Sequence, residues 1–267
     1  MTAAWRGLVA FGLLVAAGWL GRGLAPSSAL FQGVLTEGVL LRLAAAAKLA
    51  FLAVAAATAW RVAARLEADN PARRPWLVFA VGLGGFCAGQ AVLSAYQVAT
   101  GATPFPSVAD VVFVLAYPFL TAGLFGFVRA YREAGYPVGT AAEHRRFALG
   151  LAAALAVVGY LIASPILAAP GPLLERLLTA AYPVLDLVLL VPALALLRVT
   201  ARFGGRVSEI WTRLLAGLLC VAVADAAFAY FSVLGMTGLD PLVHAFFILA
   251  YLLLAEGARR QHRLLAG

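Results

Sequence analysis

Eight long apolar segments dominate this sequence and decide what it can fold into. They cover approximately residues 5–25, 37–61, 76–99, 108–130, 147–168, 174–198, 211–235 and 241–258. An α-helix needs roughly 20 apolar residues to cross the hydrocarbon core of a bilayer, and each segment comes close to that length. Hydrophobic residues make up 64% of the 267 residues and charged residues only 12%, whereas soluble domains are about 45–50% apolar and about 25% charged. The sequence therefore predicts an all-α, polytopic membrane protein with eight transmembrane helices. It excludes a soluble enzyme, a nucleic-acid-binding domain and a disordered chain.

The arginines are unevenly distributed between the two ends of these segments. Of the 19 arginines, 16 belong to loops and helix ends on one side, and only Arg22, Arg42 and Arg176 belong to the other. Cytoplasmic loops carry the excess of Lys and Arg in membrane proteins. We therefore expect a multi-pass protein of the inner (plasma) membrane with both termini in the cytoplasm. This topology signal also accounts for the net charge of +8, so no nucleic-acid partner is expected.

Short sequence matches recur between the two halves of the chain. FVLAYPFLTAG at 113–123 matches FILAYLLLAEG at 247–257, and WRVAAR at 60–65 parallels LRVTAR at 197–202, at offsets of 134 and 137 residues. Matches that keep their order at a nearly constant offset are typical of an internal duplication.

The duplication predicts two four-helix membrane repeats, residues 1–140 and 141–267. Four crossings return the chain to its starting side, so the repeats are expected to be parallel and related by an axis along the membrane normal. Segment 5–25 has a basic residue near its start and ends near small residues, a pattern that a cleavable signal peptide also shows. The repeat favours retention of this segment.

Three charged residues lie near the middle of predicted spans. Lys48 is the only lysine of the chain, and Asp186 and Asp225 lie at nearly the same depth in other segments. A charge at the bilayer centre costs about 2.5–3.5 kcal/mol on translocon scales. We therefore expect Lys48 to pair with one of the two aspartates across the interface between the halves. Two roles stay open for this pair, a structural contact that fixes helix register and a ligand- or proton-binding centre.

Further polar residues predict the lining of a cavity that opens to the outside. Gln90, Ser94 and Gln97 share one face of their helix because they are spaced by four and three residues. Asp225 and Ser232 occupy positions of the second half that are equivalent to Gln90 and Gln97. Such residues also serve as contacts between membrane helices, and this interpretation stays open.

Two repeat-equivalent residues, Asp110 and His244, each begin a helix at the outer end and are expected near the mouth of that cavity. Each is followed seven residues later by a tyrosine, Tyr117 or Tyr251. For Asp110, helix capping is the alternative. Motifs of nucleotide-binding, hydrolytic, redox and metal sites are absent from the sequence, so no catalytic residue, metal ligand or cofactor is assigned.

Three stretches resemble an eight-helix membrane sensor module of bacterial, mainly actinobacterial, proteins that carry cytoplasmic GGDEF and EAL domains for cyclic-di-GMP metabolism. They are PSVADVVFVLAYPFL (106–120), LLERLLTAAYPVLDLVLL (173–190) and AGLLCVAVADAAFAYFSVLG (216–235). The resemblance covers about residues 40–263. It places Asp110, Tyr117, Tyr182, Pro183, Asp186 and Asp225 on recurring positions of the module, and it names no ligand. Because this sequence contains no such output domain, signalling would require a separate partner.

A second resemblance points to an enzyme. VAVADAAFA (221–229) is similar to an Asp-containing helix of lysoplasmalogenase-like membrane hydrolases of the YhhN type. The other acidic position of that family corresponds to Gln90 here, within AGQAVL (88–93). The loss of one carboxylate argues against hydrolysis, because acid–base catalysis usually needs both partners.

The function that we expect is therefore a non-enzymatic membrane sensor, a ligand-binding module or a subunit of a membrane complex. A lysoplasmalogenase-like hydrolase and a small-solute transporter are the alternatives. The expected partners are the lipid bilayer and a separate cytoplasmic signalling or membrane-complex protein, and a homo-oligomer stays open. The expected ligand-binding residues are Lys48, Gln90, Ser94, Gln97, Asp110, Tyr117, Tyr182, Asp186, Asp225 and His244.

Overall fold

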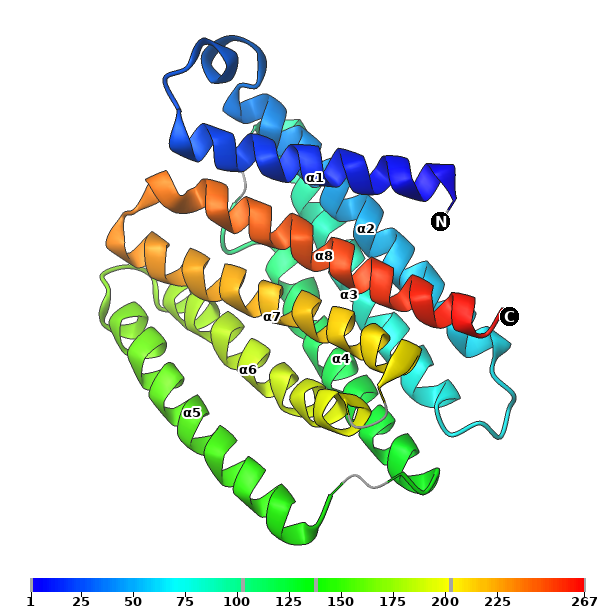
Figure 1. The fold of residues 1–267 in the computed structure, drawn as a ribbon. Coiled ribbons are helices and arrows are strands. Elements are labelled where there is room, and N and C mark those ends of the chain that lie inside the picture. The colour runs from blue at the N-terminus through cyan, green and yellow to red at the C-terminus, as the bar shows by residue number, and fades with distance from the viewer. Residues whose placement is uncertain (1, 102–103, 137–138, 202–203, 267) are drawn as a thin grey trace.

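The computed structural model describes residues 2–101, 104–136, 139–201 and 204–266, and these residues form a bundle of eight long α-helices (Figure 1). The helices are α1 (Ala3–Leu24), α2 (Glu37–Arg65), α3 (Arg73–Thr100), α4 (Val108–Glu133), α5 (Ala141–Ala168), α6 (Leu173–Ala201), α7 (Gly205–Leu234) and α8 (Asp240–Leu264). A π-helical turn, Leu30–Val34, precedes α2, and a 3₁₀ turn, Thr237–Leu239, precedes α8. The described residues contain no strand. The predicted all-helical class is therefore confirmed, and all eight helices are long and apolar enough to cross a membrane.

Local sequence explains where the helices begin and end. Ser107 caps α4 through the backbone N–H of Ala109, and the Asp110 side chain accepts the Ser107 N–H in return. Such a capping box satisfies backbone donors that the first helical turn leaves free. Gly101 and Gly235 end α3 and α7 in the left-handed conformation, with φ of 70° and 67°, which glycine adopts without a steric penalty.

Several helices extend further than the apolar segments that predict them. α2 continues to Arg65 and α3 begins at Arg73, although the apolar segments end at 61 and begin at 76. Arginine favours helix nearly as well as alanine, and charged residues beyond the hydrocarbon carry no penalty. Loop residues, and not the first charged side chain, therefore end these helices.

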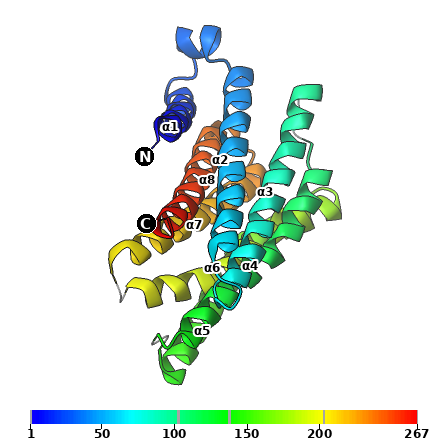
Figure 2. The same cartoon turned by 90° about the vertical axis from the view of Figure 1, so that its right-hand side faces the viewer.

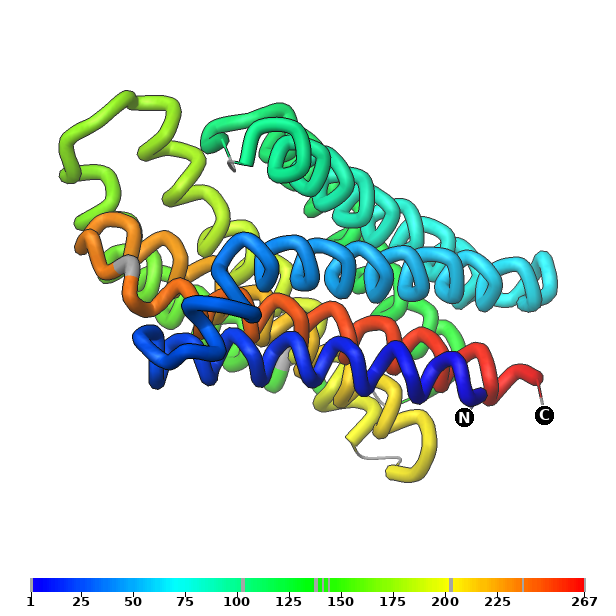
Figure 3. The backbone as a smooth tube through the Cα atoms, turned by 90° about the horizontal axis from the view of Figure 1, so that it is seen from above, coloured from blue at the N-terminus to red at the C-terminus, as the bar shows by residue number. Residues whose placement is uncertain are grey.

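The helices pack so that the two termini of the chain lie at the same end of the bundle (Figure 3). α8 packs against α7, α2 and α1, and α3 packs against α4 and α2 (Figure 2). α6 packs against α7, α4 and α5. α4 and α8 therefore connect the first four helices to the last four.

Small residues allow α3 and α4 to approach each other closely. A Cβ atom added to Gly82 would lie 2.8 Å from the backbone nitrogen of Leu120, and one added to Gly123 would lie 2.9 Å from the backbone nitrogen of Phe79. Real Cβ atoms do not come this close to a backbone. Glycines are favoured at such helix crossings in membrane proteins because they let the backbones meet.

The interface between α7 and α8 uses glycines at the corresponding positions. A Cβ atom at Gly217 would lie 2.9 Å from Leu254 Cγ and 2.9 Å from the Ala250 carbonyl oxygen. One at Gly257 would lie 2.7 Å from Leu214 Cγ. The same reciprocal pair of glycine contacts therefore occurs in each half of the chain, at offsets of 134 and 135 residues.

Candidate functional site

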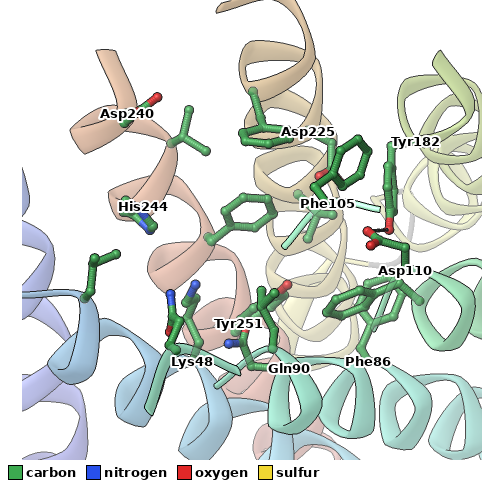
Figure 4. Close-up of a pocket in the computed structure, with 18 of the residues that line it drawn as sticks. Lys48, Phe86, Gln90, Phe105, Asp110, Tyr182, Asp225, Asp240, His244 and Tyr251 are labelled. Atoms are coloured by element: carbon green, nitrogen blue, oxygen red, sulfur yellow. Dashed lines mark hydrogen bonds between the residues drawn. The ribbon is translucent and has the colours of Figure 1, made fainter. Parts of the chain in front are cut away.

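A cavity of about 320 Å³ lies among α2, α3, α4, α7 and α8, with one side chain from α6 (Figure 4). Its mouth is lined by Glu37 and Asp240, the first residues of α2 and α8, and both are exposed. Its inner part is lined by Lys48, which lies 11 residues further along α2, or roughly 16 Å at 1.5 Å per residue. The mouth therefore lies at the end of the bundle that is opposite to the chain termini.

Eight of the ten predicted site residues line this cavity. They are Lys48, Gln90, Gln97, Asp110, Tyr117, Tyr182, Asp225 and His244. Of the other two, Asp186 lies behind Tyr117 and Ser94 is bonded within its own helix. The structure thus brings the polar residues of both halves together around one space, and ligand binding there stays a prediction.

Lys48 is buried and has no polar partner among the described residues. Its side chain is 5% exposed, and Nζ lies 5.8 Å from the centroid of the Phe247 ring. The predicted ion pair with Asp186 or Asp225 is therefore wrong. α2 packs mainly against α3 and α8, whereas the two aspartates belong to α6 and α7. Residues at equal depth pair only if their helices are neighbours, and the sequence does not show which helices are neighbours.

The two aspartates instead meet at a tyrosine. The Tyr117 hydroxyl donates a hydrogen bond of 2.8 Å to Asp186 Oδ1 and lies 3.4 Å from Asp225 Oδ2. A hydroxyl group has one hydrogen, so it cannot donate fully to both carboxylates. Asp186 is 1% exposed and receives the shorter bond, while Asp225 is partly exposed to the cavity. Asp225 is therefore the carboxyl group that a ligand can reach.

A second tyrosine–aspartate pair lies nearer the mouth. The Tyr182 hydroxyl of α6 donates a hydrogen bond of 2.7 Å to Asp110 Oδ1, as the dashed line in Figure 4 marks. Asp110 Oδ2 accepts hydrogen bonds from the Ser107 backbone N–H at 2.6 Å and from its hydroxyl at 2.9 Å. Asp110 thus caps α4, as the alternative reading predicts, and also joins α4 to α6. Its two oxygens are already occupied, which leaves it little capacity for a ligand.

Three buried polar atoms at or behind the cavity wall have no hydrogen-bond partner among the described residues. They are His244 Nδ1, Gln97 Oε1 and Asp186 Oδ2. The His244 ring stacks on Trp19 of α1, with ring centroids 4.2 Å apart. Buried polar atoms in proteins are nearly always hydrogen-bonded.

The predicted polar stripes are only partly correct. Gln90 and Gln97 line the cavity, but Ser94 donates a hydrogen bond of 2.7 Å to the Gln90 carbonyl oxygen of its own helix. Serine commonly satisfies its hydroxyl in this way, so it does not need to face a cavity. Ser232 is exposed and is not part of the lining. Spacing alone therefore overestimated how far each stripe follows the cavity wall.

The sequence reasoning missed the aromatic part of the lining. Phe86, Phe113, Phe228 and Phe247 all line the cavity. Each lies three or four residues from a polar lining residue of its own helix, such as Asp225 for Phe228 or His244 for Phe247. This spacing places both on one helix face, so pairs of a polar residue and a phenylalanine would have revealed them.

Beyond the inner end of the cavity, aromatic rings pack the part of the bundle nearer the chain termini. Trp76 of α3, Phe127 of α4 and Trp211 of α7 are almost completely buried. Phe127 lies 5.0 Å from Trp76 and 4.9 Å from Trp211, measured between ring centroids. These rings do not line the cavity and lie ten residues beyond its lining residues Phe86, Tyr117 and Val221 on the same helices, so the cavity ends near the middle of the bundle.

Comparisons with protein-family models, with curated proteins and with solved structures find no match to this chain. Within the described ranges, no group of three or more His, Cys, Asp or Glu side chains is arranged to hold a metal ion. The chemistry of the site follows from its own residues, which offer one free ammonium group, one accessible carboxyl group and amide groups between aromatic walls.

Proposed function

We propose that this chain is a non-enzymatic ligand-binding protein of the inner membrane, acting as a sensor module or as a subunit of a membrane complex. The observation that carries the proposal is Lys48, a 5% exposed cation that lines the cavity without any partner among the described residues. An unpaired buried charge costs several kcal/mol, which packing does not repay. An anionic group of a bound ligand would supply the missing counter-charge and stabilise the Lys48 ammonium group.

The ligand is proposed to enter from outside the cytoplasm. The mouth of the cavity lies at the end where only Arg22, Arg42 and Arg176 represent the basic residues. The opposite end carries the arginine excess that is typical of cytoplasmic loops, together with both termini. A blind cavity with an external mouth suits a sensor.

The proposal includes two parallel four-helix repeats. The reciprocal glycine contacts of Gly82 and Gly123 in the first half, and of Gly217 and Gly257 in the second, support it. The cavity would then form between the halves, with both contributing polar groups. Movement of one half against the other would carry the signal to a separate cytoplasmic or membrane-complex partner, in agreement with the resemblance to the sensor module. A homo-oligomer is compatible with this arrangement.

A membrane hydrolase is the second candidate, and one observation favours it. Asp186 supplies a second carboxyl group beside Asp225. It could stand in for the acidic residue of the hydrolase family, whose position is occupied by Gln90 in this chain. However, Asp186 is 1% exposed and is separated from the cavity by Tyr117. A substrate in the cavity would reach Asp225 alone, so the geometry favours binding. The packing of Trp76, Phe127 and Trp211 in the part of the bundle beyond the cavity likewise disfavours a transport path through the bundle.

The test is native mass spectrometry of the protein purified in lipid nanodiscs. The wild type is expected to retain a small molecule in addition to lipid, and Lys48→Met is expected to lose it. Ser232→Ala is the matched control because Ser232 is exposed and does not line the cavity, and it is expected to retain the molecule. Identical bound species in the wild type and in Lys48→Met would refute the role of the cavity.

A further inference from the structure

The uncommitted charges of the cavity have opposite signs and lie on different helices. Lys48 of α2 has no hydrogen bond or ion pair among the described residues, and the polar partners of Asp225 of α7 there are Tyr117, at 3.4 Å, and the neighbouring carboxyl group of Asp186. Two of the other three carboxyl groups that line the cavity are already engaged, because Glu37 forms an ion pair of 2.9 Å with Arg22 and Asp110 is bonded by Tyr182 and Ser107. The third, Asp240, is exposed at the mouth. The cavity therefore has one positive pole and one negative pole.

Each pole has polar groups that complete a binding site. Near Lys48, His244 Nδ1 is without a partner, and Figure 4 places His244 and Lys48 along the same side of the cavity. At the other pole, Tyr117 links Asp225 to the buried Asp186. Aromatic rings line the space between the two poles, including Phe86 and Tyr251. A ligand that fits must therefore carry charge at two places on an apolar body.

A ligand with a single charge satisfies only part of this cavity. An anion at Lys48 would leave the Asp225 carboxyl without a counter-charge, and it would have to pass the exposed acid Asp240 at the mouth. A cation at Asp225 would leave the Lys48 ammonium group unpaired. Both arrangements leave a charge that is removed from water without compensation.

We propose that the cavity binds a small zwitterion, with its carboxylate or phosphate at Lys48 and its ammonium group at Asp225. This inference rests on the proposed function and adds the chemical class of the ligand. A zwitterion has no net charge, so the acidic mouth does not repel it. The shared chemistry has two sources, a free amino acid and the headgroup of a zwitterionic phospholipid, which the experiment separates.

The experiment measures binding to the purified protein in nanodiscs made of phosphatidylglycerol alone, by isothermal titration calorimetry. The first set of probes is glycine, β-alanine, γ-aminobutyrate and ε-aminocaproate, together with leucine and phenylalanine. Hexanoate and hexylamine are the matched probes, each with one charge of ε-aminocaproate. Glycerophosphoethanolamine, and nanodiscs that contain phosphatidylethanolamine, test the lipid source.

At least one zwitterion is expected to bind at least about tenfold more tightly than the matched acid or amine. Lys48→Met and Asp225→Asn are each expected to raise its Kd by about tenfold to a hundredfold, because the free energy of one hydrogen bond to a charged group corresponds to a change of that size. Ser232→Ala is expected to leave the Kd unchanged. Lys48→Gln and Asp225→Ser replace the first two variants if either does not elute as a folded protein in size-exclusion chromatography.

Binding of glycerophosphoethanolamine, but not of the free amino acids, assigns the site to a lipid headgroup, and the converse assigns it to a free zwitterion. The inference is overturned if hexanoate or hexylamine binds as tightly as ε-aminocaproate, or if no zwitterion binds. These results are distinct from failure of the proposed function. If native mass spectrometry finds a retained compound of another class, the binding role stands and only the assignment of a zwitterionic ligand is rejected.

Discussion

Replacing Tyr117 with phenylalanine tests the polar cluster that joins α4, α6 and α7. The substitution removes one hydroxyl oxygen and keeps the ring, which packs against Phe86 with centroids 5.3 Å apart. Asp186 then loses the only hydrogen bond that the described residues give to Oδ1, and its Oδ2 already has none. Because Asp186 is 1% exposed, water from the cavity does not replace the lost donor.

The expected loss of stability is about 2 kcal/mol. A hydrogen bond to a charged group contributes about 1.5–3 kcal/mol, while hydrogen bonds between membrane helices average only about 0.6 kcal/mol with a maximum near 1.7. The bond of 2.8 Å to a buried carboxyl group belongs at the upper end of the membrane values. The 3.4 Å contact with Asp225 is too long to add much.

Tyr251→Phe is the matched control. Tyr251 occupies the position that the sequence matches align with Tyr117, is 4% exposed and lines the cavity, but its hydroxyl forms no hydrogen bond within the described part of the chain. Its substitution is expected to cost less than about 0.5 kcal/mol. Reversible unfolding of the purified protein in mixed micelles, titrated with sodium dodecyl sulfate, measures both values.

A double variant distinguishes the hydrogen bond from a packing defect. In the Tyr117→Phe background, Asp186→Asn is expected to recover about 1 kcal/mol, because the asparagine amide supplies its own hydrogen-bond donors where the Tyr117 hydroxyl has been lost. The reasoning is refuted if Tyr117→Phe and Tyr251→Phe have equal effects, or if Asp186→Asn adds its full cost to that of Tyr117→Phe.

Three further predictions follow from the same structure. Lys48→Met is expected to raise the free energy of unfolding by about 1–2 kcal/mol, since an unpaired charge leaves the bundle, and a fall in the same detergent titration would indicate a partner for Lys48. Gly217→Ala is expected to destabilise the protein by about 1–3 kcal/mol because its Cβ would meet the α8 backbone, whereas Gly159→Ala, with no neighbour within 4 Å, should unfold like the wild type. Reporter fusions at Ala68 and Gly101 are expected to show the cytoplasm and the exterior respectively, and the same signal from both would contradict the topology.

The helices were predictable because the bilayer imposes a length and a composition on each of them. All eight were expected near their observed positions, and the errors lie at charged ends such as Arg65 and Arg73, where hydropathy falls but the helix continues. The depth of the charged residues follows from the sequence as well, because a rise of 1.5 Å per residue places Lys48 and Asp225 at about the same level. Which helices are neighbours depends on packing of side chains from both halves, and no local pattern records it. The ion pair of Lys48 was therefore predicted wrongly, whereas eight of the ten residues predicted for the site do line one cavity.

The matching glycine contacts in α3–α4 and α7–α8 have a consequence for how the cavity distinguishes one end of a ligand from the other. Two identical four-helix subunits would place the same side chain on both sides of their diad, and a ligand could then bind in two equivalent orientations. In this chain the corresponding positions hold different residues, with Gln90 against Asp225 and Asp110 against His244. Lys48 and Asp186, which lie within one residue of equivalence, even have opposite charges. Under the proposed duplication, fusion of the two units into one chain would remove this equivalence, and a ligand in the cavity would then bind in a single orientation.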